Sequence, residues 1–498
     1  MEIVQPDLSG EREIATHGPG EFTGEITMIS GQRCLVRGRV TSPGQFLELT
    51  ADGLRSLVAR DAELSEIFMR AFILRRLALI SRGQGNVILM GSRHCANTLR
   101  IREFLSRNAH PYNYVDLDTD KTSQALLDRF EVKTGDIPVV ICNGNTVLRN
   151  PTPQQVADCL GFNASIDTSQ VRDLVIVGAG PSGLAAAVYA ASEGLDALVI
   201  ETEAPGGQAG SSSKIENYLG FPTGVSGQEL AARSIAQAQK FGAKMMVGHR
   251  VVQLNCRRRP FQVVLDNGNT LAARAVVIST GAQYNKPPIA NLKNFEGQGI
   301  YYGATYIEAQ LCEDEDVVVV GGGNSAGQAA VYLAHGARKV HMLVRSELSE
   351  TMSRYLIQRI TDNPAIELHC QTEIVALDGD RQLERVTWLD RKTGETSTHN
   401  IRHVFIMAGA SPRTDWLRGC VAMDDKGFIL TGRDLDVSTG VIPPSPWPLT
   451  RSPQMLETSL PGVFAVGDVR SGNVKRVASA VGEGAIAIHL VHRALAEP

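Results

Sequence analysis

The chain has 498 residues, of which 43% are hydrophobic and 20% are charged, and its net charge is −4. This length allows about three domains of ordinary size, and the nearly balanced charge gives no reason to expect nucleic acid or an anionic membrane as a partner. No apolar run approaches the roughly 18 residues that cross a bilayer, and no charged and then apolar leader opens the chain. The eight cysteines are scattered without a pairing pattern, which is typical of a reducing compartment. We therefore expect a cytoplasmic protein.

The first 83 residues contain a glycine-rich turn, a short strand and a helix-rich tail. The turn carries Glu25 and leads to Gly31-Gln32-Arg33, the strand covers residues 36–40, and the tail covers residues 51–79. This order resembles the back half of a cyclic-nucleotide-binding domain, which implies a partial β-barrel with helices. In that family a glutamate holds the ribose and an arginine contacts the cyclic phosphate, and Glu25 and Arg33 match these residues in type. Because the front strands of the barrel are absent, either the chain start is truncated or this is a docking module, and nucleotide binding stays open.

Residues 84–166 alternate strand and helix on a small scale. The pattern predicts a strand over residues 86–90, a helix over 96–108, a strand over 112–117 and a hairpin of residues 137–142 and 145–148. This arrangement resembles a thioredoxin or glutaredoxin fold. By that resemblance, Ile137-Pro138 would be the cis-proline strand that faces the active site.

The redox turn of such a domain would be Ser92-Arg93-His94-Cys95, at the start of its first helix. The N-terminus of a helix lowers the pKa of a thiol, so Cys95 is a candidate reactive thiol. The nucleophile of the glutaredoxin motif stands at the first position, however, and that position is Ser92. We therefore favour a structural adaptor with an inert cysteine, and monothiol exchange through Cys95 is the alternative.

The segment from Asp173 to Gly183 is an apolar strand that runs into a glycine turn, with Gly178, Gly180 and Gly183, and then into a helix of small residues. The glycines let the backbone approach a pyrophosphate, and the helix N-terminus supplies N–H donors. Glu201 ends the next strand, where a carboxylate accepts hydrogen bonds from ribose hydroxyls. A strand, a glycine turn and an acid in this order are specific for a dinucleotide, and we expect FAD here.

A second strand and glycine turn follow at residues 317–326. Arg345 stands where the first unit has its acid, and a cation at this place suits the 2′-phosphate of NADPH, with Arg354 as a helper. NADH is the alternative coenzyme. The residues expected to hold this second dinucleotide are Gly321, Gly323, Asn324, Ser325, Ala326, Arg345 and Arg354.

Four further segments are characteristic of one enzyme family. They are Pro205-Gly-Gly-Gln208, Ile215-Glu-Asn217-Tyr-Leu-Gly-Phe-Pro222, Ser279-Thr-Gly281 and Pro461-Gly-Val-Phe-Ala-Val-Gly467-Asp468. With them, the chain from about residue 170 onward resembles the low-molecular-weight thioredoxin reductases, which are pyridine nucleotide-disulfide oxidoreductases. The resemblance implies that the FAD is also contacted by Gln208, Asn217, Gly281, Gly467, Asp468, Lys475, Arg476 and Val477. The last three stand where the family usually has Arg-Gln-Ala beside the flavin, so contacts to the ring are altered there.

The resemblance also implies the fold class, which is α/β with two Rossmann-like domains. A nicotinamide domain, residues 287–412, would be inserted between two parts of an FAD domain, residues 167–286 and 413–498. The domain of residues 84–166 and the partial barrel of residues 1–83 precede them. A homodimer, and a large rotation of the nicotinamide domain during turnover, are further implications.

The family does its chemistry with a Cys-Ala-Thr-Cys motif just before the second glycine turn. This chain has Tyr302-Gly303-Ala304-Thr305-Tyr306 there, and no C-x-x-C occurs anywhere in the sequence. A flavin reduces a disulfide only where two thiols can close and reopen through a thiolate. Cys312, shortly after this segment, is a weaker candidate thiol, and a small core residue is the simpler interpretation. We interpret the other cysteines, including Cys256 and Cys420, as core or incidental residues.

The sequence therefore predicts an FAD-dependent NAD(P)H oxidoreductase that passes hydride from nicotinamide to flavin and then to an unidentified acceptor, which could be a small redox protein. One alternative is a thioredoxin-disulfide reductase that uses Cys95 or Cys312. Another is a non-catalytic flavin or nucleotide sensor. His94 and His249 have no partners at ligand spacing, so we predict no metal site.

Overall fold

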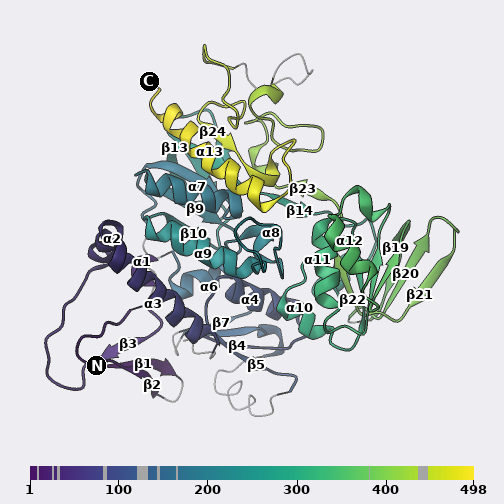
Figure 1. The fold of residues 1–498 in the computed structure, drawn as a ribbon, viewed down its shortest axis with the longest axis horizontal. Coiled ribbons are helices and arrows are strands. Elements are labelled where there is room, and N and C mark those ends of the chain that lie inside the picture. Colours follow the sequence, from purple (N-terminus) through teal and green to yellow (C-terminus); the bar gives the residue numbers. More distant parts are fainter. Residues whose placement is uncertain are drawn as a thin grey trace.

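The computed structural model describes residues 1–7, 10–24, 27–30, 34–81, 87–119, 133–142, 146–163, 166–380, 382–435 and 447–497. Within these ranges the chain forms two large α/β units, a small α/β domain and an N-terminal module. The second large unit extends as a lobe to one side of the other parts (Figure 1). None of the helices in these ranges is both long and apolar enough to cross a membrane.

The first large unit is built on a seven-stranded sheet with the order β10-β9-β8-β13-β12-β11, in which β24 also pairs with β13. Its strands are β8 (Arg172–Val177), β9 (Ala197–Glu201), β10 (Lys244–Val247), β11 (Val251–Asn255), β12 (Phe261–Leu265), β13 (Thr270–Ile278) and β24 (Val463–Ala465). Its helices are α7 (Pro181–Ser192), α8 (Gly207–Gly210), α9 (Gly227–Lys240) and α13 (Val477–Leu495), and α13 packs along α7 (Figure 1).

Strands β8, β9, β13 and β24 of this sheet run parallel, and most of their side chains are buried on both faces. Burial on both faces explains why these segments are continuous apolar runs in the sequence rather than alternating ones. Parallel strands end at the same edge of a sheet, and ligands of open α/β sheets bind beyond that edge. The first glycine turn follows β8 at this edge.

The second large unit has a parallel five-stranded sheet with the order β15-β22-β16-β17-β18. The strands are β15 (Ile300–Tyr301), β16 (Asp316–Val320), β17 (Lys339–Leu343), β18 (Ile366–His369) and β22 (His403–Ile406). The helices are α10 (Tyr306–Leu311), α11 (Asn324–Leu333) and α12 (Arg354–Thr361). An antiparallel meander of β19 (Thr372–Asp378), β20 (Arg385–Asp390) and β21 (Thr396–His399) follows β18.

A two-stranded antiparallel ribbon joins the two large units. It pairs β14 (Ala282–Tyr284), which leaves the first unit, with β23 (Ala410–Pro412), which returns to it. Short 3₁₀ turns occur at Thr134–Asp136, Leu292–Phe295, Leu348–Glu350, Asp415–Leu417, Gly432–Leu435 and Gly467–Val469. The α/β class with two Rossmann-type units, predicted from the sequence, is confirmed.

In its described residues, the small α/β domain has a four-stranded sheet with the order β5-β4-β6-β7 and the helices α4 and α6. Its elements are β4 (Val87–Gly91), α4 (Ala96–Arg107), β5 (Asn113–Asp116), β6 (Val139–Cys142), β7 (Thr146–Arg149) and α6 (Pro153–Leu160). Each segment predicted here as a strand or a helix has that structure, and the Ile137–Pro138 peptide bond is cis. The likeness of this domain to a thioredoxin fold stays a prediction.

The small domain shares its core with the first large unit. Phe104 and Phe162 stack at a centroid distance of 6.3 Å within a buried cluster that continues into Leu174 of β8. Across the same boundary, the side-chain amide of Asn163 donates to the carbonyl of Val247 and accepts from its N–H, each at 2.9 Å. This continuous core makes the small domain an integral part of the body rather than a tethered arm.

The N-terminal module differs from the predicted partial β-barrel. Its described strands β1 (Glu2–Asp7), β2 (Gly10–Thr16) and β3 (Arg37–Arg39) form a three-stranded antiparallel sheet with the order β2-β1-β3. The predicted helical tail is two helices, α2 (Ala51–Arg60) and α3 (Ala62–Ser81), after a short α1 (Thr27–Ser30). Glu25 and Arg33 lie outside the described residues.

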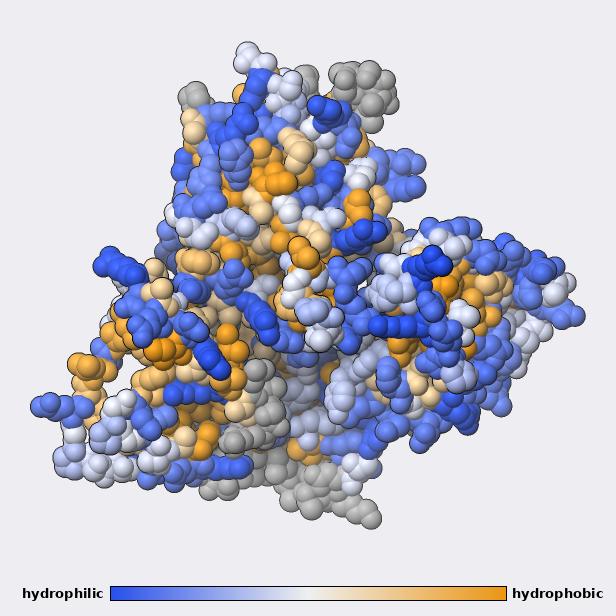
Figure 2. Space-filling view, viewed as in Figure 1, coloured by the Kyte–Doolittle hydropathy of each residue, from blue (hydrophilic) through white to orange (hydrophobic). Residues whose placement is uncertain are grey.

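Apolar side chains gather on the surface of this module (Figure 2). The exposed ones include Phe46, Leu47 and Leu49, which lie on an extended segment before α2. Three short strands cannot enclose a core, so the described strands of this module form an open sheet rather than a barrel.

Two cysteines that we interpreted as unpaired form a disulfide. Cys256 follows β11, Cys420 lies 164 residues later, and their Cα atoms are 5.7 Å apart. We had interpreted both as core or incidental residues, and the sequence analysis did not predict this bond. The sequence did not reveal this pair because the two residues meet only after the second large unit has been inserted between them.

Candidate active site

The first glycine turn is shaped by close backbone contacts. Gly178 has φ = +103°, and a Cβ at this position would lie 2.4 Å from the carbonyl oxygen of Ser279. The Ser279 hydroxyl donates to the carbonyls of Val177 and Gly178, at 2.9 and 2.7 Å. Gly180 is the N-cap of α7, and Gly183 lies in its first turn. The turn thus presents the N-terminus of a 12-residue helix at the carboxyl edge of the sheet, where it can hold a pyrophosphate.

Glu201 lies at the end of β9, beside this turn. Its carboxylate accepts hydrogen bonds from the backbone N–H of Ala179, at 2.8 Å, and of Glu203, at 3.0 Å. Burial raises the pKa of Glu201, and the two N–H donors oppose that rise. A half-buried carboxylate in this place has lone pairs left for further donors, such as ribose hydroxyls.

Asp468 brings a second carboxylate to the same turn from the far end of the chain. It follows Gly467, which has φ = +73° and where a Cβ would lie 2.5 Å from the hydroxyl of Ser182 in α7. Burial raises the pKa of Asp468, and within the described ranges its carboxylate accepts no hydrogen bond from the protein. A half-buried acceptor without a donor is costly, so it fits a bound group that carries hydroxyls, as the ribityl arm of FAD does.

The remaining residues predicted for FAD lie around this edge. Gln208, on α8, donates its side-chain amide to the carbonyl of Ala282, next to Gly281, which has φ = +65°. The Asn217 side chain is exposed. Lys475, Arg476 and Val477 lie at the start of α13, where Arg476 is the N-cap and the Lys475 ammonium lies 5.2 Å from the centre of the Phe428 ring.

The second glycine turn repeats the design of the first. Gly321 has φ = +143°, and a Cβ there would lie 2.6 Å from the carbonyl oxygen of Met407, so only glycine fits. Gly323 is the N-cap of α11, and Asn324 accepts a hydrogen bond from the N–H of Ser353 at 2.7 Å. Burial raises the pKa of Tyr284 in the ribbon, the neighbouring Ser325 side chain opposes that rise, and Ala326 is fully buried.

Two guanidinium groups flank this second turn. Arg345 lies just beyond the carboxyl end of β17, and Arg354 begins α12. Both side chains are exposed, and neither forms an ion pair or hydrogen bond with another described residue. Unpaired cations at the mouth of a glycine turn suit an anionic ligand.

The segment that replaces the dithiol of the family runs between the two units. Gly303 lies against Ser211, the C-cap of α8, since a Cβ on the glycine would be 3.9 Å from the Cβ of that serine. Tyr306 begins α10 and leaves 68% of its surface exposed. The Tyr302 hydroxyl donates to Glu296 at 2.7 Å. This segment therefore lies against the end of α8 in the first unit and carries no sulfur.

The two candidate thiols differ in their surroundings. Cys312 is buried, and its Sγ–H donates to the carbonyl of Glu308 at 2.9 Å. Burial, reinforced by the carboxylates of Glu308 and Glu315, raises its pKa, so the reactive thiolate is disfavoured. Cys95 is the N-cap of α4, is partly exposed and is a free thiol.

Sequence reasoning missed how α4 contacts the first unit. The Arg107 guanidinium donates to the carbonyls of Gly207, at 3.0 Å, and Ala204, at 3.4 Å, in the loop that precedes and begins α8. At the other end of α4, a Cβ on Gly297 of the second unit would lie 2.8 Å from the Cβ of Ala96. Helix α4 therefore contacts both large units, and no local sequence pattern signals such a long-range contact.

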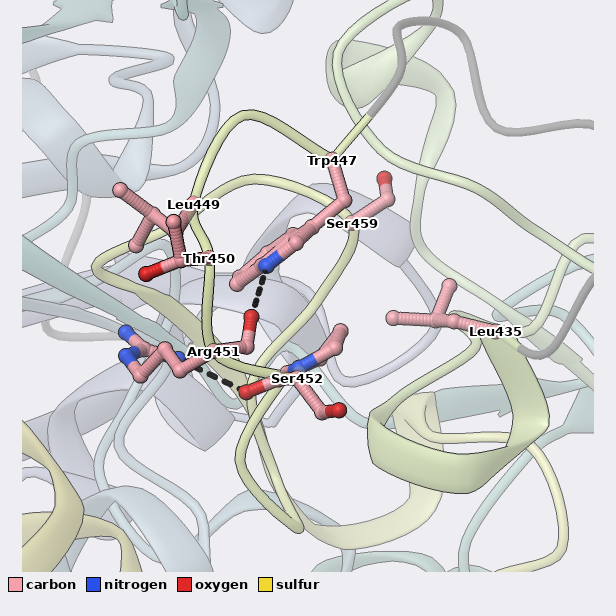
Figure 3. Close-up of a pocket in the computed structure, with 8 residues that line it drawn as sticks. Leu435, Trp447, Leu449, Thr450, Arg451, Ser452 and Ser459 are labelled. Carbon is pink, nitrogen blue, oxygen red and sulfur yellow. Dashed lines mark hydrogen bonds between the residues drawn. The ribbon is translucent and has the colours of Figure 1, made fainter.

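A cavity of about 240 Å³ is lined by residues 435, 447, 449–453 and 459, none of which belongs to a glycine turn (Figure 3). Trp447 and Arg451 form its wall, and the indole N–H donates to the carbonyl of Arg451. The guanidinium of Arg451 is already bound to the carboxylates of Glu457 and Glu497. The cavity is smaller than most ligand pockets, which occupy about 300–1,000 Å³, and we assign it no role.

Comparisons with known proteins agree with this geometry. The model of the family "Pyridine nucleotide-disulphide oxidoreductase" matches residues 172–484. A thioredoxin reductase of Mycolicibacterium smegmatis is 33% identical over 335 residues, which are 67% of this chain and 99% of that protein. A thioredoxin reductase of Streptomyces clavuligerus is 32% identical over 330 residues, or 66% of this chain and 95% of that protein.

Two solved structures are similar over the same part of the chain. The structure of Lactococcus lactis thioredoxin reductase in its FR conformation gives a TM-score of 0.58 at 25% identity, and the match covers 66% of this chain and 100% of that one. The structure of T. acidophilum thioredoxin reductase gives a TM-score of 0.57 at 29% identity, and covers 65% and 98%.

Proposed function

Because the chain belongs to the pyridine nucleotide-disulphide oxidoreductase family, we propose that it is an FAD-dependent NAD(P)H oxidoreductase whose electrons do not leave through a dithiol beside the flavin. The overall reaction would consume NADPH, a proton and an oxidised acceptor, and would release NADP⁺ and the acceptor reduced by two electrons. The observation that carries the proposal is the presence of two glycine turns on two joined Rossmann-type units, with Gly303 and Tyr306 at the dithiol positions.

FAD supports this chemistry, when bound, by taking a hydride from the nicotinamide and passing two electrons onward. The chain's own part would be to bind and orient the two dinucleotides. The N-terminus of α7 would hold the FAD pyrophosphate, with Glu201 on the ribose and Asp468 on the ribityl arm. The N-terminus of α11 would hold the coenzyme pyrophosphate, and Arg345 with Arg354 would bind the 2′-phosphate that distinguishes NADPH from NADH.

The acceptor would have to meet the flavin directly, because no thiol replaces the lost pair. Gly303 has no side chain, Tyr306 has no redox-active sulfur, and Cys312 is buried with a raised pKa. A quinone, oxygen, a second flavin or a small redox protein would each fit such a route.

In agreement with the resemblance, we also propose that the protein is a homodimer, which light scattering on the purified chain would test.

A thioredoxin-disulfide reductase that works through Cys95 is the second candidate. It is favoured by the position of this partly exposed thiol at the N-cap of a 12-residue helix that contacts both large units. The absence of a second thiol at glutaredoxin spacing, where Ser92 stands, argues against it. The shared core of the small domain and the first unit also argues against the domain swinging between sites.

Rapid mixing with NADPH, followed by a panel of acceptors, separates these functions. We expect anaerobic NADPH to bleach the flavin of the full chain, and a quinone, oxygen or free flavin to restore its colour over many turnovers. We expect no insulin-coupled reduction of thioredoxin, by the wild type or by the Cys95→Ser and Cys312→Ser variants. The second candidate would be established instead if the wild type reduced thioredoxin, Cys95→Ser abolished this activity and Cys312→Ser left it intact. A flavin that NADPH does not bleach would exclude both candidate functions.

A further inference from the structure

Three potential metal ligands meet in the second large unit, away from the glycine turn. His341 lies in the middle of β17, and Glu367 and His369 lie on the neighbouring strand β18. His341 Nδ1 is 3.1 Å from His369 Nε2, and His369 Nε2 is 3.5 Å from a carboxylate oxygen of Glu367. One donor atom from each of the three residues lies within 4.8 Å of the others.

The parallel pairing of the two strands creates this cluster. His341 stands opposite Glu367 in the ladder, and His369 lies two residues further along on the same face of β18. This face is turned toward the meander, because Leu343, on the same side of β17 as His341, packs with Trp388 of β20 in one buried cluster. Residues that are 28 positions apart in the sequence thus share one site, which is why ligand spacing did not predict it.

Trp388 and His399 form one wall of the cluster. The Trp388 ring centre lies 5.5 Å from that of His341 and 5.5 Å from that of His369. His399 stacks on the other part of the indole at 3.7 Å, and its Nε2 contacts the Ser397 hydroxyl at 2.9 Å. The donor atoms that converge are those of His341, His369 and Glu367, which gives two imidazoles and one carboxylate.

The donor spacing matches the coordination sphere of a small cation. Bonds of about 2.0–2.1 Å to a tetrahedral Zn²⁺ place neighbouring donor atoms roughly 3.3 Å apart. Two of the three separations, 3.1 and 3.5 Å, lie on either side of that value, and the third is no longer than 4.8 Å. Glu367 binds Lys339 at 3.0 Å with its other carboxylate oxygen, which leaves the oxygen near His369 for a metal.

We propose that His341, Glu367 and His369 bind one divalent transition-metal ion, with Zn²⁺ as the best-matched ion. Two imidazoles and a carboxylate are the donors that Zn²⁺ takes in His₂Glu sites, with a fourth position for water. Such an ion would link the edge strand β18 to its neighbour β17. Arg345 lies just beyond the carboxyl end of β17. The site is independent of the FAD turn and of the acceptor, so it does not rest on the proposed function.

The test uses the full-length, FAD-loaded chain without a histidine tag, stripped with EDTA and titrated with Zn²⁺ and with Co²⁺. We expect one ion per chain, and for Co²⁺ the intense visible bands of a tetrahedral site, to the red of the flavin absorption. Glu367→Gln and His369→Ala should each weaken binding by about tenfold or more, since even outer partners of a metal ligand are worth 10–100-fold. His335→Ala, at an exposed histidine of the same unit, is the matched control and should bind as the wild type does.

Because Glu367 is exposed, Glu367→Gln should fold as the wild type does, and its flavin spectrum should be unchanged. This variant therefore separates loss of metal binding from loss of folding. Equal Zn²⁺ affinity in the wild type, Glu367→Gln and His369→Ala would overturn the proposal, as would an octahedral Co²⁺ spectrum in the wild type. Stoichiometric binding that is lost in these two variants and kept in His335→Ala would support it, whether or not the chain oxidises NADPH.

Discussion

The exposed guanidinium of Arg345 is the residue that we expect to select the coenzyme. It has no partner among the described residues, so a bound 2′-phosphate would not have to compete with an internal ion pair. One charge-assisted hydrogen bond is worth about 1–2 kcal/mol, which corresponds to roughly 5–30-fold in kcat/KM. Arg345→Ala should therefore lower kcat/KM for NADPH by that factor and leave the value for NADH nearly unchanged.

Arg338→Ala is the control for this measurement, because Arg338 is an exposed arginine of the same unit that is already paired with Asp316 at 2.8 Å. It should change neither coenzyme's kcat/KM. A wild-type enzyme that prefers NADH, or an equal loss with both coenzymes in Arg345→Ala, would contradict the role assigned to this side chain.

A second prediction at the same scale concerns Asp468, the half-buried carboxylate without a donor. If it accepts a hydrogen bond from the ribityl arm, its removal should leave that hydroxyl unpaired and cost about 1.5–3 kcal/mol, or roughly 10–100-fold in FAD affinity. We expect Asp468→Ala to be purified with less flavin and to show a higher Kd when FAD is added back. Asp415→Asn, at an exposed carboxylate paired with Arg418, should retain full flavin content. Equal flavin content in the two variants would refute the assignment.

Helix α4 connects the small domain to the loop that leads into α8, and Arg107 makes the contact. Arg107→Ala removes the donor to the carbonyls of Ala204 and Gly207, and each lost bond to a charged group is worth about 1.5–3 kcal/mol. We expect faster hydrogen exchange in residues 204–210 and weaker FAD binding, because Gln208 lies in the same segment. Arg100→Ala, at an exposed arginine of the same helix, should leave exchange in this segment unchanged. Unchanged exchange in Arg107→Ala would show that the shared core alone holds the domain in place.

The elements that the sequence predicted well are those determined by local pattern. The apolar runs became β8 and β16, and the glycine turns became the starts of α7 and α11, because strand, turn and helix propensities agree there. The strands and the helix of the small domain were found in the same way. The predicted partial barrel was not found, because the described strands β1 to β3 pair into a small antiparallel sheet of order β2-β1-β3.

What the sequence could not predict are contacts between distant segments. The Cys256–Cys420 disulfide spans 164 residues, and the cluster of His341, Glu367 and His369 depends on the register of β17 against β18. The docking of α4 likewise depends on two carbonyl groups, which carry no side-chain signal. In each case the partners are brought together by sheet order and domain insertion, which local periodicity does not encode.

At the scale of the whole molecule, the two glycine turns, the connecting ribbon and the segment of Gly303 contain no cysteine. In the proposed function these parts would line the path from nicotinamide to flavin. The cysteines lie elsewhere in the fold or are chemically unsuited to this path. Cys312 is buried with a raised pKa, and Cys256 and Cys420 are bonded to each other. The other free cysteines lie in the N-terminal module, in the small domain or just after β18, and they are Cys34, Cys95, Cys142, Cys159 and Cys370. Electron transfer to the flavin should therefore be independent of thiol chemistry.

This independence gives a direct prediction. After treatment with iodoacetamide, which should modify the partly exposed Cys95, the rate of flavin reduction by NADPH should equal that of the untreated enzyme. The enzyme reduced by two electrons should show the spectrum of reduced flavin, without the long-wavelength charge-transfer band that a thiolate beside oxidised flavin produces. Cys95→Ser separates modification at this residue from any effect elsewhere, because it should abolish labelling of the α4 peptide without changing the rate. A charge-transfer band in the wild type, or a rate that alkylation lowers in Cys95→Ser as well as in the wild type, would mean that another cysteine reaches the flavin. Gly303 and Tyr306 would then not end the family's thiol route.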